Sequence, residues 1–256
     1  MKKLLLLFIL LVNMQADILN SIVQTKKIRV CIWPEYYGIS YIDKRTQMLT
    51  GIDVDLAKEF AKDLHVNLEF VKSSFANLIK DVSTHYCDIA MFAIGQTEKR
   101  KEYLSLTSPH LSSDIFAIAS KTNNRIKNWR DIDKNGVIVA VAKGTYHVDV
   151  MKTRLKNATL LVLDSMHARE QEVQSGRADV FMTDYPFGMR MIKQYDWPKM
   201  IKPPKPFHMT PYGWAIAKHE SAFLKRTEQF IQEIKKDGRL LKIAQKYELE
   251  PIVLDK

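Results

Sequence analysis

The 256-residue chain has few of the residues that mark a disordered or a disulfide-built protein, with only nine glycines, nine prolines and two cysteines. Hydrophobic residues make up 46% of it and charged residues 27%, which excludes wholesale disorder because a packed core is available. Basic residues exceed acidic ones by 39 to 29, a formal charge of +10. Since the basic residues are spread among acids along the chain, they predict a solvated surface and no nucleic-acid partner.

The sequence also lacks the short motifs of several enzyme classes. It has no HExxH, no paired-cysteine spacing, no P-loop, no dinucleotide fingerprint and no serine nucleophile elbow, and its seven histidines are scattered. These absences predict no metal site, no cofactor and no catalytic residue.

One apolar run of nine residues, 4–12, follows Lys2 and Lys3. It is far shorter than the ~20 residues that span a bilayer, whereas a basic start and an apolar run of this length are typical of a secretory signal peptide. We expect residues 1–16 to be removed, with cleavage after Ala16, and the mature chain to be exported to the periplasm.

Export would permit the two cysteines to form a disulfide. Cys31 lies near the end of one apolar run and Cys87 lies just before another. If these runs are neighbouring parallel strands, the thiols stand at opposite ends, ~10 Å or more apart at about 3.3 Å per residue. A bridge needs Cα atoms within about 7 Å. We therefore expect two buried free thiols.

Strands and helices alternate along most of the chain, without internal repeats or long linkers. Apolar, β-branched runs predict strands, and segments with apolar residues at helical spacing lie between them. The expected strands are 28–32, 66–71, 88–92, 137–141, 160–163, 179–182 and 212–217, and the expected helices follow Gly51 and Phe75 and occupy 149–156, 165–174, 222–236 and 240–247. This alternation predicts parallel sheets in an α/β protein.

Six short segments stand in a definite order along the chain. They are GIDVDLAKEFA at 51–61, SFANLI at 74–79, CDIAM at 87–91, TEKR at 97–100, GT at 144–145, and GRADV leading to TD at 176–184. In kind and order they resemble the motifs of bacterial extracellular solute-binding proteins of the amino-acid type, family 3, over nearly the whole mature chain. The resemblance implies a two-lobed, type II periplasmic-binding-protein-like α/β fold, with parallel-rich sheets and two hinge crossings. Lobe 1 would comprise 17–112 and 208–256, and lobe 2 would comprise 113–207.

A closed cleft that holds an amino acid must supply a cation for the carboxylate and an anion for the ammonium. Arg100 follows a strand and a turn that begins at Gly95, where N–H groups and a guanidinium can grip a carboxylate. Asp184 ends an apolar strand, at the sheet edge where ligands bind in open α/β folds. The resemblance gives the matching residues these two roles. Taken alone, Arg100 would be a solvated charge, and capping of the following helix is the alternative role for Asp184.

Thr145 follows Gly144 at a helix start, where N–H groups and a hydroxyl could contact the ligand from lobe 2. The family often has Ser or Thr shortly before the carboxylate-binding Arg, but Ala93 and Gly95 stand at those positions here. We therefore expect either that part of the carboxylate contact comes from the backbone or that the ligand differs from those of such relatives.

Aromatic residues are the expected walls of the pocket. Tyr36 and Phe75 match positions whose rings sandwich the ligand side chain in relatives, and Trp33 and Tyr146 are further candidates. Core packing is the alternative for each ring. Relatives selective for cationic amino acids carry an acid near Trp33, so Lys and Arg are less expected ligands, although Glu35 leaves them open.

An enzyme of the same fold is the main alternative. The segment from Arg154 to Asp184 is also similar to periplasmic cyclohexadienyl (arogenate/prephenate) dehydratases, which need a general acid in the cleft. In those enzymes a Glu follows the matching Thr-Asp by three residues, but Phe187 stands there in this chain. We therefore expect binding without catalysis.

The expected function is that of a periplasmic binding protein. It would be a monomer that captures an amino acid, or a similar small amino or carboxylate compound, and delivers it to an inner-membrane ABC permease. A ligand-presenting partner of a membrane sensor would use the same cleft, and the sequence does not separate the two.

Overall fold

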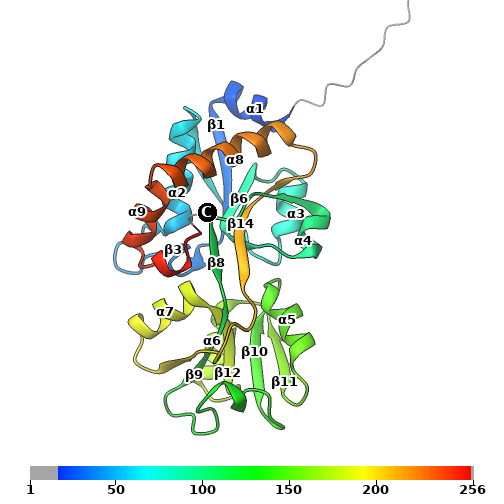
Figure 1. Cartoon of the computed structure of the whole chain (residues 1–256), viewed down its shortest axis with the longest axis vertical. Helices are drawn as coiled ribbons and strands as arrows, with labels where there is room; N and C mark the ends of the chain where they lie inside the picture. The colour runs from blue at the N-terminus through cyan, green and yellow to red at the C-terminus, as the bar shows by residue number, and fades with distance from the viewer. Residues whose placement is uncertain (1–16, 255–256) are drawn as a thin grey trace, which may run out of the picture.

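Two β-sheets organise the computed structural model, which describes residues 17–254 (Figure 1). We call the part around the first sheet the upper lobe and the part around the second sheet the lower lobe, as they stand in Figure 1. The expected signal peptide, residues 1–16, lies outside the described residues. The two-lobed α/β fold class is confirmed, whereas the lobe boundaries at 112 and 207 stay a prediction.

The sheet of the upper lobe has the strand order β5-β1-β6-β14-β7, with β8 paired to β14. Its first three strands are parallel, and β14 runs antiparallel to β6, β7 and β8. Its elements are α1 (Ile18–Thr25), β1 (Lys27–Ile32), α2 (Ile52–Asp63), β5 (Asn67–Lys72), α3 (Leu78–Ser83), β6 (Ile89–Gly95), α4 (Glu98–Tyr103), β7 (Leu104–Leu106), β8 (Leu111–Ser113), β14 (Thr210–Ala217), α8 (Ser221–Lys236), α9 (Arg239–Lys246) and the 3-10 helix η2 (Glu250–Ile252). A separate small sheet contains β2 (Glu35–Tyr36), β3 (Ser40–Ile42) and β4 (Leu49–Thr50).

The sheet of the lower lobe has the order β11-β10-β12-β9-β13. Strands β10, β11 and β12 are parallel, and β9 is antiparallel to its neighbours β12 and β13. Its elements are β9 (Ile115–Ser120), the 3-10 helix η1 (Trp129–Asp131), β10 (Ile138–Ala142), α5 (Tyr146–Arg154), β11 (Thr159–Leu163), α6 (Met166–Gln174), β12 (Val180–Asp184), α7 (Tyr185–Gln194) and β13 (Pro198–Ile201). The central strands β6 and β12 are buried along their whole length, which explains why the sequence of each is a nearly continuous apolar run.

The chain passes between the lobes twice. It leaves the upper sheet after β8 and enters β9 through Asp114, and it returns from β13 to β14 through the Pro-containing segment 202–209 (Figure 1). The Asp114 carboxylate accepts the backbone N–H groups of Phe207 at 2.8 Å and His208 at 2.7 Å. One side chain therefore ties the two crossings together.

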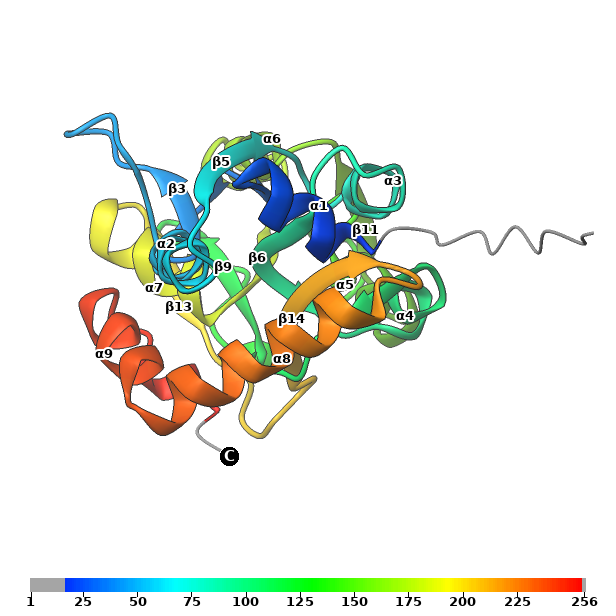
Figure 2. The same cartoon turned by 90° about the horizontal axis from the view of Figure 1, so that it is seen from above.

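Helices α1 and α8 both lie at the top of the upper lobe, which Figure 2 shows from above, and they contact each other near their N-terminal ends. The Asp17 carboxylate caps α1 and also accepts the N–H of Ala222 at 2.9 Å, while Glu220 accepts the N–H of Ile18 at 2.7 Å. These reciprocal bonds satisfy N–H groups that a helix start leaves unpaired. No helix within 17–254 is long and apolar enough to cross a membrane.

The expectation of two free thiols is wrong. Cys31 and Cys87 form a disulfide with their Cα atoms 5.6 Å apart, inside the range that a bridge requires. The expected separation holds only if the strand at 88–92 extends straight back through Cys87, but β6 begins at Ile89 and residues 84–88 form a turn. Because Cys87 lies in this turn, the spacing of 3.3 Å per residue along a strand does not apply to it.

Candidate functional site

Arg100 lies where the two lobes meet. Its α4 helix begins at the N-cap Thr97, whose hydroxyl oxygen accepts the N–H of Arg100 at 3.3 Å. The buried guanidinium donates to the Gly95 carbonyl at 2.8 Å in the upper lobe and to the Gly144 carbonyl at 3.2 Å in the lower lobe. These contacts use two of its five N–H donors. Burial lowers the pKa of Arg100 to about 10, so the side chain stays charged at neutral pH.

Asp184 lies at the end of β12 and is 1% exposed. It caps α7, accepting the N–H of Phe187 at 3.4 Å, so the helix-cap interpretation holds. Its Oδ2 also accepts hydrogen bonds from the hydroxyls of Tyr36 and, at 2.9 Å, of Tyr212. Burial raises the pKa of Asp184 because the charged form is desolvated. The carboxylate is thus held between the lobes by neutral donors.

A chain of hydroxyl groups continues from Asp184 toward Arg100. The hydroxyls of Tyr212 and Tyr146 lie 3.0 Å apart. A Cβ on Gly95 would stand 3.2 Å from the ring of Tyr146 and 3.3 Å from the Arg100 guanidinium, so glycine permits this close packing. Burial raises the pKa of each of these tyrosines, which keeps them neutral hydrogen-bond donors.

Phe75 is the centre of the aromatic wall. Its ring centroid lies 5.1 Å from that of Trp33, 5.8 Å from that of Tyr36 and 5.0 Å from that of Phe92, all edge-to-face. The Arg100 guanidinium lies 5.0 Å from the Phe75 centroid. Phe75 therefore links the guanidinium to the rings of Trp33 and Tyr36.

Two cavities meet at Phe75. One, of about 260 Å³, is lined by Phe75, Arg100, Thr145 and Tyr146 among others. The second, of about 450 Å³, is lined by Trp33, Glu35 and Phe75 together with residues of both lobes. The sequence-predicted residues Arg100, Gly95, Tyr36, Phe75, Trp33, Tyr146, Thr145 and Asp184 are thus distributed around one interlobe region.

The ligand contact of Thr145 stays a prediction. Its hydroxyl donates to the Ala142 carbonyl at 2.7 Å within the lower lobe, so this donor is already engaged. Its neighbour Gly144 makes the closer contact between lobes. A Cβ on Gly144 would stand 2.5 Å from the backbone nitrogen of Ala76 and 2.6 Å from the carbonyl carbon of Phe75.

Sequence reasoning missed Tyr212 and Arg169. Arg169 is fully buried on α6, donates to the Met182 carbonyl at 2.8 Å and lies 4.7 Å from the Phe187 ring centroid. Its positive charge favours the ionised form of Asp184. The helical spacing of the sequence could have indicated Arg169, because it occupies the same buried face of the helix as Met166 and Val173. No local pattern in the sequence indicates Tyr212, since its hydroxyl bonds Asp184, which is distant in the sequence.

Within the described part of the chain, no group of three or more His, Cys, Asp or Glu side chains is placed to hold a metal ion. The chemistry that the site offers is the binding of a small polar molecule by the buried Arg100 guanidinium, the buried Asp184 carboxylate and an aromatic wall.

Residues 28–250 match the profile of bacterial extracellular solute-binding proteins, family 3. The chain is 26% identical over 229 residues to cyclohexadienyl dehydratase of Pseudomonas aeruginosa, covering 88% of this chain and 84% of that protein. The solved structures that are similar to this chain include two crystal structures. The ancestral amino acid-binding protein AncCDT-1, a precursor of cyclohexadienyl dehydratase, is 31% identical with a TM-score of 0.82, covering 90% of this chain and 99% of its own. A putative ABC-transporter binding component of Wolinella succinogenes, complexed with lysine, is 28% identical with a TM-score of 0.79, covering 86% and 95%. The chain belongs to the bacterial extracellular solute-binding proteins, family 3.

Proposed function

We propose that the chain is a periplasmic binding protein that captures an amino acid between its lobes and delivers it to an inner-membrane ABC permease. The observation that carries the proposal is the presence of a buried guanidinium, Arg100, and a buried carboxylate, Asp184, at the junction of the two lobes. A ligand that pairs with both charges stabilises the closed conformation and shifts the population toward it.

The contacts suggest how a ligand enters this arrangement. The ligand carboxylate pairs with the Arg100 guanidinium, competing with the Gly144 carbonyl, which accepts at 3.2 Å. The ammonium donates to Asp184, where Oδ1 accepts only the long 3.4 Å bond from Phe187 among the described residues. Charge-assisted bonds of this kind are about twice as strong as neutral ones.

Trp33 and Glu35 bear on the side chain of the ligand. Trp33 stands where an acid would favour a cationic side chain, but Glu35 lines the same cavity of about 450 Å³. The related Wolinella protein is complexed with lysine. A ligand screen therefore needs both cationic and neutral amino acids.

The first test is a thermal-shift screen of residues 17–256 against the twenty L-amino acids, with prephenate and arogenate included. A ligand at one hundred times its dissociation constant adds about 2.7 kcal/mol of stability. A rise in Tm with one amino-acid class supports the proposal and identifies the ligand, whereas no rise with any amino acid contradicts it.

The site assignment has its own test. Arg100→Ala and Asp184→Ala should each weaken binding by about 2–4 kcal/mol, because each leaves a desolvated charge of the ligand unpaired. The control is Lys101→Ala, on the exposed side of the same helix, where the lysine pairs with Glu98. Unchanged affinity in both site variants would show that the ligand binds elsewhere.

A dehydratase is the second candidate, favoured by the similarity to the Pseudomonas enzyme. The position of the expected general acid is filled by Phe187, which is fully buried and stacked 5.1 Å from the ring of Tyr37. A phenyl ring cannot donate a proton. Turnover of prephenate or arogenate by the purified chain would nevertheless show that the protein is a dehydratase.

Delivery to a permease needs a separate experiment. Pull-down of the ligand-bound chain from inner membranes should retain the subunits of an ABC transporter. Retention of a sensor protein instead would favour the ligand-presenting role.

A further inference from the structure

Asp53, in the first turn of α2, has a fully buried carboxylate that the binding site itself does not use. Its Oδ2 accepts the backbone N–H of Ala93 at 2.7 Å, and its Oδ1 accepts the indole N–H of Trp214 at 2.9 Å. The Nε2 of buried His110 lies 3.5 Å from the same Oδ1. One carboxylate thus contacts three segments that are far apart in the sequence.

The first of these segments is a bulge in the central strand β6. Ile94 pairs with Gly213 and Ala90 pairs with Ala215, so three residues of β6 stand opposite the single residue Trp214. Within the bulge Ala93 has φ of +49°, in the left-handed region that residues with a Cβ rarely adopt. A bulge interrupts the regular ladder and leaves backbone groups without strand partners. The Asp53 carboxylate accepts the Ala93 N–H at this interruption.

The bulge sets the direction of the C-terminal end of β6, which leads to Gly95 and Arg100. Gly95 lies two residues beyond Ala93, and its carbonyl accepts from Arg100 at 2.8 Å. Gly95 is also the residue that pairs with Tyr212 of β14. If the bulge relaxed, the position of the Arg100 guanidinium relative to Tyr212 would change.

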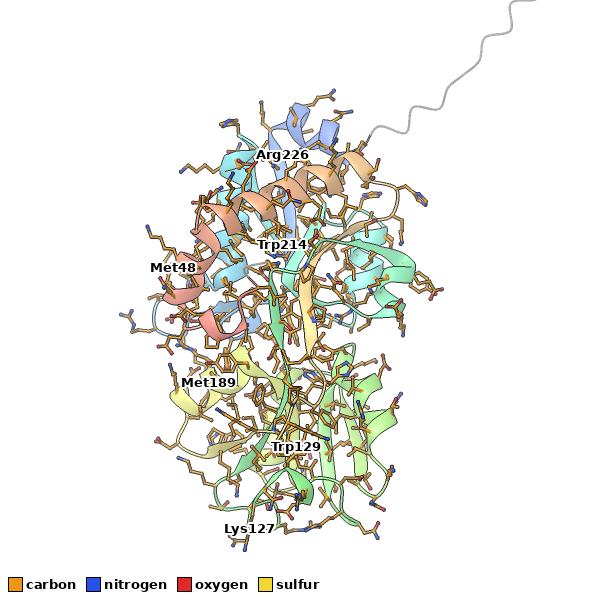
Figure 3. The ribbon with its side chains drawn as sticks, in the orientation of Figure 1. Met48, Lys127, Trp129, Met189, Trp214 and Arg226 are labelled. Carbon is orange, nitrogen blue, oxygen red and sulfur yellow. A yellow bond between two sulfur atoms is a disulfide. The ribbon has the colours of Figure 1, made fainter. Side chains whose placement is uncertain are left out.

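The other two segments lead to the crossings between the lobes. Trp214 lies in the interior of the upper lobe (Figure 3), on β14, two residues after Tyr212, which bonds Asp184. His110 directly precedes β8, donates its N–H to the Tyr212 carbonyl at 3.0 Å, and has its ring 4.8 Å from that of Trp214. Strand β8 leads into one crossing and β14 follows the other, so Asp53 contacts the residue before β8 and the middle of β14.

We propose that Asp53 is a positioning residue for ligand binding, which holds the Gly95–Arg100 strand end in register with both interlobe crossings. This inference rests on the binding site proposed above. Any buried carboxylate that accepts two hydrogen bonds contributes to the stability of the fold. Asp53 is proposed in addition to affect ligand affinity and the closure of the lobes.

The decisive variant is Asp53→Asn, which keeps the shape of the side chain. Ala93 and Trp214 each present a donor to a different oxygen, but an amide has only one acceptor oxygen. The amide NH₂ must therefore face one of the two donors. The matched control is Asp88→Asn. Asp88 lies just before the other end of β6 and is also buried, and its carboxylate accepts the backbone N–H of Arg29 at 2.7 Å.

Hydrogen exchange of the full mature chain without ligand provides the first readout. We expect amides 93–96 to exchange at least tenfold faster in Asp53→Asn than in wild type, and to be unchanged in Asp88→Asn. In the same variants, affinity for the amino acid with the largest thermal shift should fall at least tenfold in Asp53→Asn and less than twofold in Asp88→Asn. If no amino acid shifts the wild type, the proposed function itself fails, whereas binding by the wild type with unchanged affinity in Asp53→Asn overturns this inference alone.

Two results would overturn the inference. One is unchanged exchange at 93–96 in Asp53→Asn, and the other is faster exchange with unchanged affinity, which would leave Asp53 a purely structural role. If Asp53→Asn does not fold, Trp214→Phe takes its place, because it removes one donor and leaves the Ala93 bond. Its amides 93–96 should exchange about threefold faster, and no acceleration in this variant would count against the inference.

Discussion

The hydroxyl of Tyr36 in the upper lobe donates a hydrogen bond to the carboxylate of Asp184 in the lower lobe. Tyr36 belongs to the short strand β2, and Asp184 ends β12, the central strand of the other sheet. Both side chains are buried. We call this arrangement, in which the lobes are in contact, closed; it is stabilised in part by the same carboxylate that we assign to the ligand ammonium.

Tyr36→Phe should destabilise the closed arrangement by about 1–3 kcal/mol, because it removes a donor from a buried carboxylate. Small-angle scattering of the unliganded chain should then show a larger radius of gyration than that of wild type. Tyr103→Phe is the control, since Tyr103 is 47% exposed and its hydroxyl has no bond within the described residues. Equal radii for all three proteins would mean that the Tyr36 hydroxyl does not govern closure.

The pH dependence of stability should reveal the buried charge of Asp184. Burial raises its pKa in the folded chain above the usual value of 3.8. The folded state therefore binds the proton more tightly than the unfolded state, and this contribution to stability is lost as pH rises through the raised pKa. We expect the free energy of unfolding of wild type to fall, relative to that of Asp184→Asn, as pH rises from about 4 to 7. Urea unfolding at several pH values measures this difference, and parallel profiles would contradict it.

The disulfide should make a large contribution to the stability of the upper lobe. Cys31 and Cys87 are 56 residues apart in the sequence, and closing a loop of this length is worth about 4 kcal/mol in the chain-entropy account. The double variant Cys31→Ser/Cys87→Ser should lose stability of this order in urea. Dithiothreitol should lower the stability of wild type toward that of the variant and leave the variant unchanged. An effect of reductant on both proteins would point to another cause.

The sequence predicted the strands that form the centre of each sheet. The run at 88–92 corresponds to β6 (Ile89–Gly95) and the run at 179–182 to β12 (Val180–Asp184), because central strands buried on both faces are apolar along their length. It did not predict β8 (Leu111–Ser113), which is too short and too polar to show a period of two. Such strands form only because a longer neighbour, β14, offers them backbone partners.

For the candidate site, the sequence indicated which side chains to consider but not what they contact. The motif order singled out Arg100 and Asp184, whereas the Gly144 carbonyl that Arg100 contacts belongs to a segment 44 residues away. The wrong expectation for Cys31 and Cys87 has the same origin. Contacts of this kind depend on where a strand begins and how a turn bends, which local periodicity does not encode.

Gly144 offers the sharpest test of closure. Its φ is +79°, and a Cβ there would stand 2.5 Å from the backbone nitrogen of Ala76 in the other lobe. Backbone atoms at this distance cannot rotate away as a flexible side chain can. We therefore expect Gly144→Ala to hold the lobes apart and to weaken amino-acid binding at least tenfold, which is about 1.4 kcal/mol.

The matched control for this variant is Gly176→Ala. Gly176 has nearly the same φ, +77°, but a Cβ there would meet nothing within 4 Å. Both variants should lose about 1–2 kcal/mol of stability from the left-handed backbone alone. Only Gly144→Ala should also lose the ligand-induced decrease in radius of gyration. If both variants close and bind alike, the lobes do not approach each other at Gly144 in the ligand-bound state, and Arg100 does not contact the Gly144 carbonyl there.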